Sequence, residues 1–297
     1  MTDKQPAYIL FDKHTQAIIY GYQRNAIQRM LDFDYICRRP SPSVACIIDP
    51  TQEGQHKCFF GTQEILIPIY RSLDKATAEH PDADVVVNFS SFRSAYPTSR
   101  EALESDTIRT VAIIAEGMPE QRTKELIQIA QQRGKWIIGP ATVGGIAAGA
   151  FRIGNTAGTI ENIIASRLHR PGSVAYVSKS GGLSNELNNI VALNSDGVYE
   201  GIAIGGDRYP GSTFVQHLLR FQANPDIKMM VMLGEVGGLD EYDVVEALKD
   251  GRITKPLVAW CIGTCSKVFP AEVQFGHAGA RAGAERETAD ALSLIHI

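Results

Sequence analysis

Cysteine is scarce in this sequence, and long hydrophobic runs are missing. Five cysteines, an odd count, are spread over 297 residues, which predicts a reduced intracellular protein rather than a disulfide scaffold. Cys261 and Cys265 have no second Cys/His pair nearby, so we interpret them as core or loop thiols rather than zinc ligands. No stretch approaches the roughly 18 apolar residues of a membrane span. The N-terminus also lacks the apolar region of a secretory signal.

An excess of positive charge is absent too. The 29 Lys and Arg residues stand against 33 Asp and Glu residues, a formal net charge of -4. This balance argues against nucleic-acid binding and against polybasic attachment to a membrane. The sequence is 44% hydrophobic, enough for large cores without metals or disulfides, and its length predicts about two domains.

Apolar runs and helical segments alternate through the first half. Continuous apolar runs suit strands buried on both faces of a parallel sheet, so the alternation predicts a doubly wound α/β sheet. The expected strands are 17–20, 44–48, 65–69, 85–89, 111–114 and 136–138, with helices at 25–31 and 120–133.

A second α/β series follows the breaker Arg170-Pro171-Gly172, so we predict domains at 1–168 and 169–297. Its expected strands are 174–177, 201–204, 229–233 and 256–260, with helices at 184–193, 213–222 and 241–249. An amphipathic helix is expected at 285–291. The sequence then stops without a cap, so we expect that it is truncated or incorrectly terminated.

Two glycine-rich turns follow expected strands of the second series, at 178–184 (SKSGGLS) and 205–213 (GGDRYPGST). Small residues let backbone N–H groups approach an anion, and a helix start favours negative charge. Ser178, Ser180, Gly181, Gly205 and Gly206 are therefore candidate phosphate-binding residues. A plain strand-to-helix turn that needs glycine is the alternative at each place.

Two further loops carry ionisable side chains among small residues. Glu235 lies in LGEVGG, and His277 lies in FGHAGA. An accessible imidazole can act as a nucleophile or a base near neutral pH. Glu235 could orient a basic or phosphorylated group or touch a metal ion. A solvated loop glutamate and an incidental loop histidine are the alternatives.

The first series has no GxGxxG after its first strand, so the usual NAD fingerprint is absent. Polar loops instead follow its strands at 88–94 (NFSSFRS), 115–120 (AEGMPE) and 139–145 (GPATVGG). A nucleotide-bearing ligand is compatible with them, with Arg93 as a phosphate contact. A surface salt bridge of Arg93 is the alternative.

Together these loops resemble the α-subunits of the NDP-forming acyl-CoA synthetase family. The resemblance rests on GHAGA at 276–280, SKSGG at 178–182, GGDRYPG at 205–211 and GEVGG at 234–238. Longer segments resemble the ATP-citrate lyase branch of that family, at 30–35 (MLDFDY), 114–117 (IAEG), 138–146 (IGPATVGGI) and 272–277 (EVQFGH). The resemblance covers about residues 11–290.

The resemblance implies a CoA-binding Rossmann-like domain followed by a flavodoxin-like ligase-CoA domain. It implies cytosolic, ATP- and Mg²⁺-dependent conversion of citrate and CoA to acetyl-CoA and oxaloacetate, through phosphohistidine, citryl phosphate and citryl-CoA. The chain is similar to the separate subunit of a two-subunit, hetero-oligomeric enzyme, in which an ATP-grasp subunit binds the nucleotide. A citrate-synthase-like domain is expected after residue 297, so the fragment alone is expected to be inactive.

Residue roles follow from the same resemblance. His277 would be the phosphorylated nucleophile, Glu235 would hold its ring or contact Mg²⁺, and Glu116 would lie beside the citryl group. Ser178, Ser180 and Gly181 would receive phosphoryl oxygens, and Ser91, Arg93 and Ser94 would contact CoA. A succinate-specific synthetase of the same family and a non-catalytic CoA-binding module are the alternatives.

Overall fold

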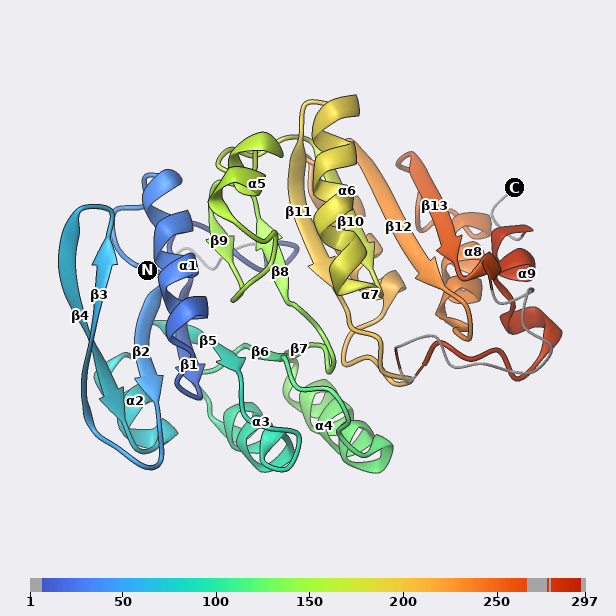
Figure 1. Cartoon of the computed structure of the whole chain (residues 1–297). Helices are drawn as coiled ribbons and strands as arrows, with labels where there is room; N and C mark the ends of the chain where they lie inside the picture. Colours follow the sequence, from blue (N-terminus) through green and yellow to red (C-terminus); the bar gives the residue numbers. More distant parts are fainter. Residues whose placement is uncertain (1–6, 266–276, 278, 295–297) are drawn as a thin grey trace.

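The computed structural model describes residues 7–265, 277 and 279–294. The first half of the chain forms a seven-stranded sheet (Figure 1). The strand order is β3-β4-β2-β1-β5-β6-β7, and every neighbouring pair is parallel except β3 with β4. The strands are β1 (Gln16–Tyr20), β2 (Val44–Ile48), β3 (Gly54–Phe60), β4 (Gln63–Tyr70), β5 (Ala83–Asn88), β6 (Thr110–Ile113) and β7 (Trp136–Ile138).

Helices cover both faces of this sheet. The helices are α1 (Arg24–Ile36), α2 (Leu73–Glu79), α3 (Ala95–Glu104) and α4 (Glu120–Arg133). Side chains of α2, α3 and α4 pack with Ile18, Val86 and Val111 of the strands in one apolar cluster. Helix α1 contributes to a different cluster, which also contains Ile19 and Val87. Alternate strand residues thus face opposite layers, as expected for a sheet buried on both sides.

The second half forms a six-stranded sheet in the order β13-β12-β10-β11-β8-β9. Strands β10 to β13 are parallel, whereas β8 is antiparallel to both β11 and β9. The strands are β8 (Gly145–Ala147), β9 (Phe151–Arg152), β10 (Val174–Ser178), β11 (Val198–Ala203), β12 (Met229–Glu235) and β13 (Leu257–Ile262). The helices are α5 (Ile160–Ala165), α6 (Gly181–Asn194), α7 (Phe214–Ala223), α8 (Asp240–Lys249) and α9 (Ala289–Leu294). Two parallel-dominated sheets confirm the predicted fold class.

The two sheets share one hydrophobic core. A single cluster joins Ile19 and Val87 of the first sheet to Phe214, Leu218 and Met230 of the second half. Helix α7 contributes to this link, because its buried His217 ring lies 5.2 Å from the ring of Trp136 in β7. Strands β8 and β9 precede residue 169 and yet pair within the second sheet. The sheet boundary and the predicted domain boundary therefore do not coincide.

Two local predictions differ from the structure. The sequence pattern predicts a segment 65–69 buried on both faces, but Leu66 is 55% exposed. The reason is that β4 forms an antiparallel hairpin with the edge strand β3. The helix predicted over 285–291 begins instead at Ala289, after a 3₁₀ turn over Glu285–Glu287. The Thr288 side chain, which accepts a hydrogen bond from the N–H of Ala291 at 3.3 Å, starts the helix anew.

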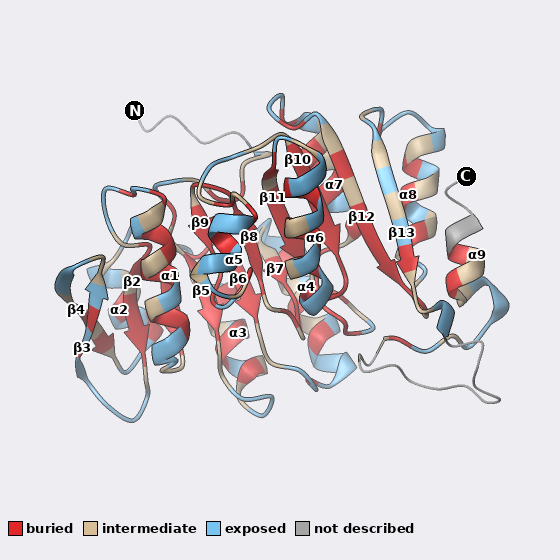
Figure 2. Cartoon of the chain, turned by 45° about the horizontal axis from the view of Figure 1, so that its top comes forward, coloured by how far each residue is buried: buried red, intermediate tan, exposed pale blue. Residues whose placement is uncertain are grey.

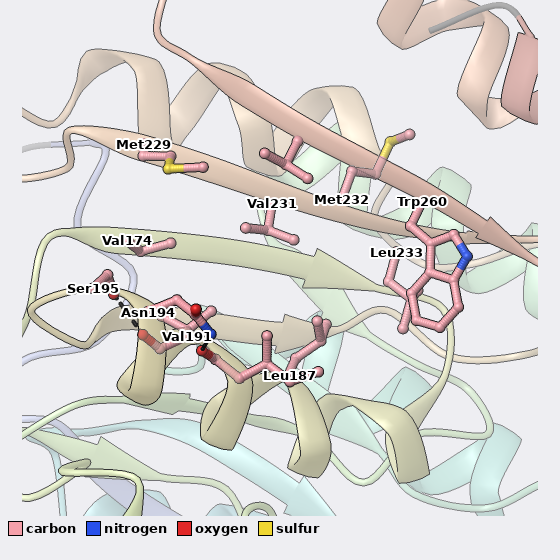
Figure 3. Close-up of a pocket in the computed structure, with 12 residues that line it drawn as sticks. Val174, Leu187, Val191, Asn194, Ser195, Met229, Val231, Met232, Leu233 and Trp260 are labelled. Atoms are coloured by element: carbon pink, nitrogen blue, oxygen red, sulfur yellow. Dashed lines mark hydrogen bonds between the residues drawn. The ribbon is translucent and has the colours of Figure 1, made fainter.

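An apolar groove lies beside α6. This helix packs on β10 and β11, and next to it the face of β12 and β13 stays open (Figure 3). The groove has a volume of about 330 Å³ and includes Leu187, Val191, Val231 and Trp260. Exposed and intermediate residues alternate over the first four residues of β13 (Figure 2). Among the described helices, none combines the length and apolar character that crossing a membrane requires.

Candidate active site at the facing strand ends

A histidine and a buried glutamate form the centre of the site. Strand β12 ends at Glu235, which is 7% exposed, and its Oε2 lies 2.8 Å from Nδ1 of His277. This hydrogen bond is the main reason that the pKa of His277 is raised above its usual value. In the neutral ring, Nδ1–H donates to the carboxylate and Nε2 keeps its lone pair. The predicted pairing of His277 with Glu235 is therefore present in the structure.

The loop after β11, which contains Gly205 and Gly206, packs against this imidazole. A Cβ on Gly206 would lie 2.1 Å from Cγ of His277, so only glycine leaves room for the ring. The N–H of Gly279 donates to the carbonyl of Gly206 at 3.0 Å. Gly205 has a φ of +99°, and its Cβ would lie 1.9 Å from the carbonyl oxygen of Pro140. Both glycines thus have a packing role, and their predicted contact with phosphate stays a prediction.

The predicted phosphate-binding turn, 178–184, follows β10 and is hydrogen-bonded to the ends of both neighbouring strands, β11 and β12. The N–H of Ile204 donates to the carbonyl of Ser178, and the N–H of Lys179 donates to the carbonyl of Leu233. The buried Ser178 hydroxyl donates to the carbonyl of Ser180 at 2.9 Å. Ser180 is the N-cap of α6, and its hydroxyl oxygen accepts from the N–H of Leu183 at 3.3 Å. Among the described residues no acceptor takes the Ser180 hydroxyl proton, so it can be donated to a phosphoryl oxygen, as can N–H groups of the first turn.

The second glycine-rich turn does not present a free helix start in the same way. Helix α7 is closed by a capping box, in which Thr213 accepts from the N–H of Gln216 and the Gln216 side chain accepts from the N–H of Thr213. Gly211 lies against Ile137 of β7, where a Cβ would come within 2.2 Å of Cγ2. This turn therefore joins the two sheets, whereas the first turn of α6 carries the Ser180 cap and no capping box.

Two more carboxylates lie within electrostatic range of His277. Glu116 is exposed after β6, and Asp207 is 7% exposed directly after Gly206. Burial and, to a smaller extent, the charge of Glu116 raise the pKa of Asp207 to about 6, while His277 opposes the shift. Asp207 was not among the predicted site residues. A carboxylate placed immediately after two glycines at a strand end was the signal that could have identified it.

The predicted CoA contacts lie in a separate loop, between β5 and α3. Asn88 is fully buried, donates to Thr98 and Ser99 of α3, and accepts from the N–H of Ser90. The loop beyond it is open to solvent: Ser91 and Arg93 are exposed, and Ser94 is half-buried. The Arg93 guanidinium lies 5.4 Å from the centre of the Phe92 ring. This guanidinium has no carboxylate partner among the described residues and is free to contact an anion.

The described residues contain no cluster of three His, Cys, Asp or Glu side chains suited to a metal ion. Oε2 of Glu235 is already bonded to His277. Mg²⁺ in phosphoryl-transfer sites usually takes one or two carboxylates together with substrate phosphates. The described part of the chain can thus offer Mg²⁺ single carboxylates beside a bound phosphate, but no complete protein site.

Comparisons with known proteins agree with this arrangement. The family profile "CoA binding domain" matches residues 12–117, and "CoA-ligase" matches residues 177–294. "Probable ATP-citrate synthase subunit 1" of Schizosaccharomyces pombe is 59% identical over 286 residues, covering 96% of this chain and 46% of the relative. Human "ATP-citrate synthase" is 58% identical over 281 residues, covering 94% of this chain and 26% of the relative.

A solved structure of ATP citrate lyase from Methanothrix soehngenii, in complex with citrate and coenzyme A, superposes with a TM-score of 0.96. It is 61% identical, and the match covers 97% of this chain and 47% of that one. The chain thus spans about half, or less, of the length of the relatives it matches. It belongs to the ATP-citrate lyase family, of which it carries the CoA-binding and CoA-ligase portions.

Proposed function

We propose that this chain is the CoA-binding, phosphohistidine-carrying part of an ATP-citrate lyase. In this reaction ATP, citrate and CoA are converted to acetyl-CoA, oxaloacetate, ADP and phosphate. The observation that carries the proposal is the His277–Glu235 pair lying against Gly206, where the strand ends of both sheets meet. The identity to ATP-citrate synthases over nearly the whole chain supports the choice of citrate.

The geometry suits a histidine that carries a phosphoryl group. Glu235 keeps a proton on Nδ1, so Nε2 is the atom that attacks the γ-phosphorus of ATP and displaces ADP. The phosphorylated ring is cationic, and the same carboxylate stabilises that charge. A carboxylate of citrate then takes the phosphoryl group, and the CoA thiol displaces phosphate from citryl phosphate. A covalent intermediate of this kind divides one difficult transfer into easier steps.

Other residues have supporting roles in the proposal. Ser180 and Gly181 at the start of α6 hold phosphoryl oxygens, and Ser178 keeps that turn in shape. Arg93, with Ser91 and Ser94, contacts the phosphates of CoA. Glu116 lies beside the citryl group that CoA attacks.

Further components complete the enzyme. An ATP-grasp subunit supplies ATP, with Mg²⁺ neutralising the phosphate charge, and the assembly is a hetero-oligomer. Cleavage of citryl-CoA takes place in a citrate-synthase-like domain. We further propose the cytosol as its compartment, because all five cysteines are free thiols.

Phosphohistidine formation provides the test. The chain is co-expressed with an ATP-grasp subunit of a two-subunit relative and incubated with γ-labelled ATP and Mg²⁺. We expect an acid-labile, alkali-stable label, which citrate with CoA removes and succinate with CoA does not. His277→Ala should take up no label. The control His14→Ala, at an exposed position near the N-terminus, should be labelled like wild type. Wild-type labelling of His277→Ala would refute the assignment, and discharge by succinate would favour a succinate-specific enzyme.

A further inference from the structure

A second buried carboxylate lies behind the His277–Glu235 pair. Glu241 is the second residue of α8, is fully buried, and reaches back over the end of β12. Its Oε1 accepts the backbone N–H of Glu235 at 3.2 Å. Its Oε2 is buried and has no hydrogen-bond partner in the part of the chain that the structure describes. Burying a carboxylate is costly, so its position requires a reason.

The loop after β12 is wrapped around this carboxylate. A Cβ on Gly234 would lie 2.6 Å from Oε1 of Glu241, and a Cβ on Gly238 would lie 2.8 Å from Oε2. Neither glycine has a positive φ, so both are needed for space rather than for backbone freedom. Two glycines of the GEVGG segment are therefore explained by the Glu241 side chain. The GEVGG segment, which contains Glu235, is thus packed directly against the Glu241 carboxylate.

A lysine from the neighbouring turn lies beside the same segment. Lys179 is 6% exposed, and its Nζ lies 3.2 Å from Oδ2 of Asp240. A Cβ on Gly238 would lie 2.9 Å from the same Nζ, which places the ammonium beside the loop. Burial raises the pKa of Glu241, and the charge of Lys179 acts against that rise. Lys179 thus places a positive charge close to the buried Glu241 carboxyl group and partly offsets the effect of burial.

We propose that Glu241 is a positioning residue for His277. It fixes the backbone of Glu235, and thereby keeps Oε2 of Glu235 at Nδ1 of the imidazole. The inference rests on the proposed function, because positioning matters only if His277 reacts. The charged groups that face the imidazole are Glu235 from β12, Asp207 from the loop after β11 and Glu116 from the loop after β6. Glu241 acts through Glu235 alone and touches no substrate.

The test uses two readouts on the full chain. The first is the titration of the His277 ring by NMR, with the resonance assigned by its loss in His277→Ala. The second is the initial rate of phosphohistidine labelling with the ATP-grasp subunit. Glu241→Ala removes the carboxylate, and Gly238→Ala displaces it while keeping it in the chain. Glu246→Ala, on the exposed side of the same helix, is the matched control.

We expect Glu241→Ala and Gly238→Ala to move the titration midpoint of His277 downward, since both loosen its bond to Glu235. Labelling should slow by about 100-fold, the effect of displacing a reacting group by roughly 1 Å. Glu241→Gln retains an acceptor for the Glu235 N–H and should restore most of both signals, and Glu246→Ala should match wild type.

Wild-type titration in folded Gly238→Ala and Glu241→Ala would overturn the inference. If Glu241→Ala does not fold, the His277 titration in Gly238→Ala and Glu241→Gln tests the inference instead. A shifted titration in a chain that never labels would uphold the positioning role of Glu241 and refute the proposed function instead.

Discussion

Replacing Asp207 with asparagine should stabilise the protein. The carboxylate is 7% exposed and lies near the negative charge of Glu116, and its pKa rises from 3.8 to about 6. A folded state that holds a proton more tightly than the unfolded chain loses stability as pH rises from the unfolded to the folded pKa. Ionised Asp207 is thus a destabilising group at neutral pH, retained beside the reacting histidine. An asparagine side chain at this position would have the same shape without the charge.

The magnitude follows from the size of the shift. A change of about 2 pKa units corresponds to about 3 kcal/mol at pH 7, and to about half of that at pH 5. We therefore expect Asp207→Asn to raise the free energy of unfolding by about 2–3 kcal/mol at pH 7. The lower end of this range allows for local contacts of the side chain, which reduce the full electrostatic gain. The gain should shrink as the pH is lowered and vanish below about pH 4.

Urea unfolding followed by circular dichroism at pH 5, 6, 7 and 8 measures this difference. Asp82→Asn, at an exposed aspartate of the first half, is the matched control and should leave stability unchanged at each pH. A variant that is less stable than wild type at pH 7 would refute the reasoning. A gain of equal size at every pH would also refute it, because the effect would then not arise from ionisation.

Three more predictions concern other parts of the molecule. Arg93→Ala should weaken CoA binding by about ten- to a hundredfold, because one charge-assisted hydrogen bond is lost. Arg100→Ala, at an arginine paired with Glu104 on α3, should leave the affinity unchanged. Equal CoA affinities of wild type and Arg93→Ala in calorimetry would exclude Arg93 from the site. Glu235→Gln should lower the NMR titration midpoint of His277, because its hydrogen bond to Glu235 is the main cause of the raised pKa; an unchanged midpoint would contradict this. Leu218→Ala, fully buried in the core shared by both sheets, should cost about 2–5 kcal/mol and lower a single thermal transition; two separate transitions would show that the cores are independent.

The sequence by itself was sufficient for the central parallel strands, and it predicted the pairing with His277 as one of two roles for Glu235. Runs such as 85–87 (VVV) and 174–177 (VAYV) are apolar throughout, and this pattern is typical of a strand buried on both faces. Their bounds agree with β5 and β10 to within two residues. The motif resemblance then paired a loop histidine with a loop glutamate, and the structure places their side chains 2.8 Å apart.

Short and edge elements could not be predicted in the same way. Strand β3 contains Gly54, Gln55, His56 and Lys57, and it exists because β4 offers an antiparallel partner. Strands β8 and β9 have only three and two residues, and they are defined by pairing with β11 and with each other. Pairing of this kind depends on segments far apart in the chain, which hydrophobic periodicity does not report.

Only the tertiary structure decided which carboxylates surround the histidine. Asp207 and Glu241 are ordinary acidic residues in the sequence, and their importance comes from burial. The glycines at 206, 234 and 238 look alike as turn residues, yet the first makes room for the His277 ring and the other two for the Glu241 carboxylate. A sequence shows only that a glycine is present, whereas the group that occupies the space beside it is known only once distant loops are brought together by the fold.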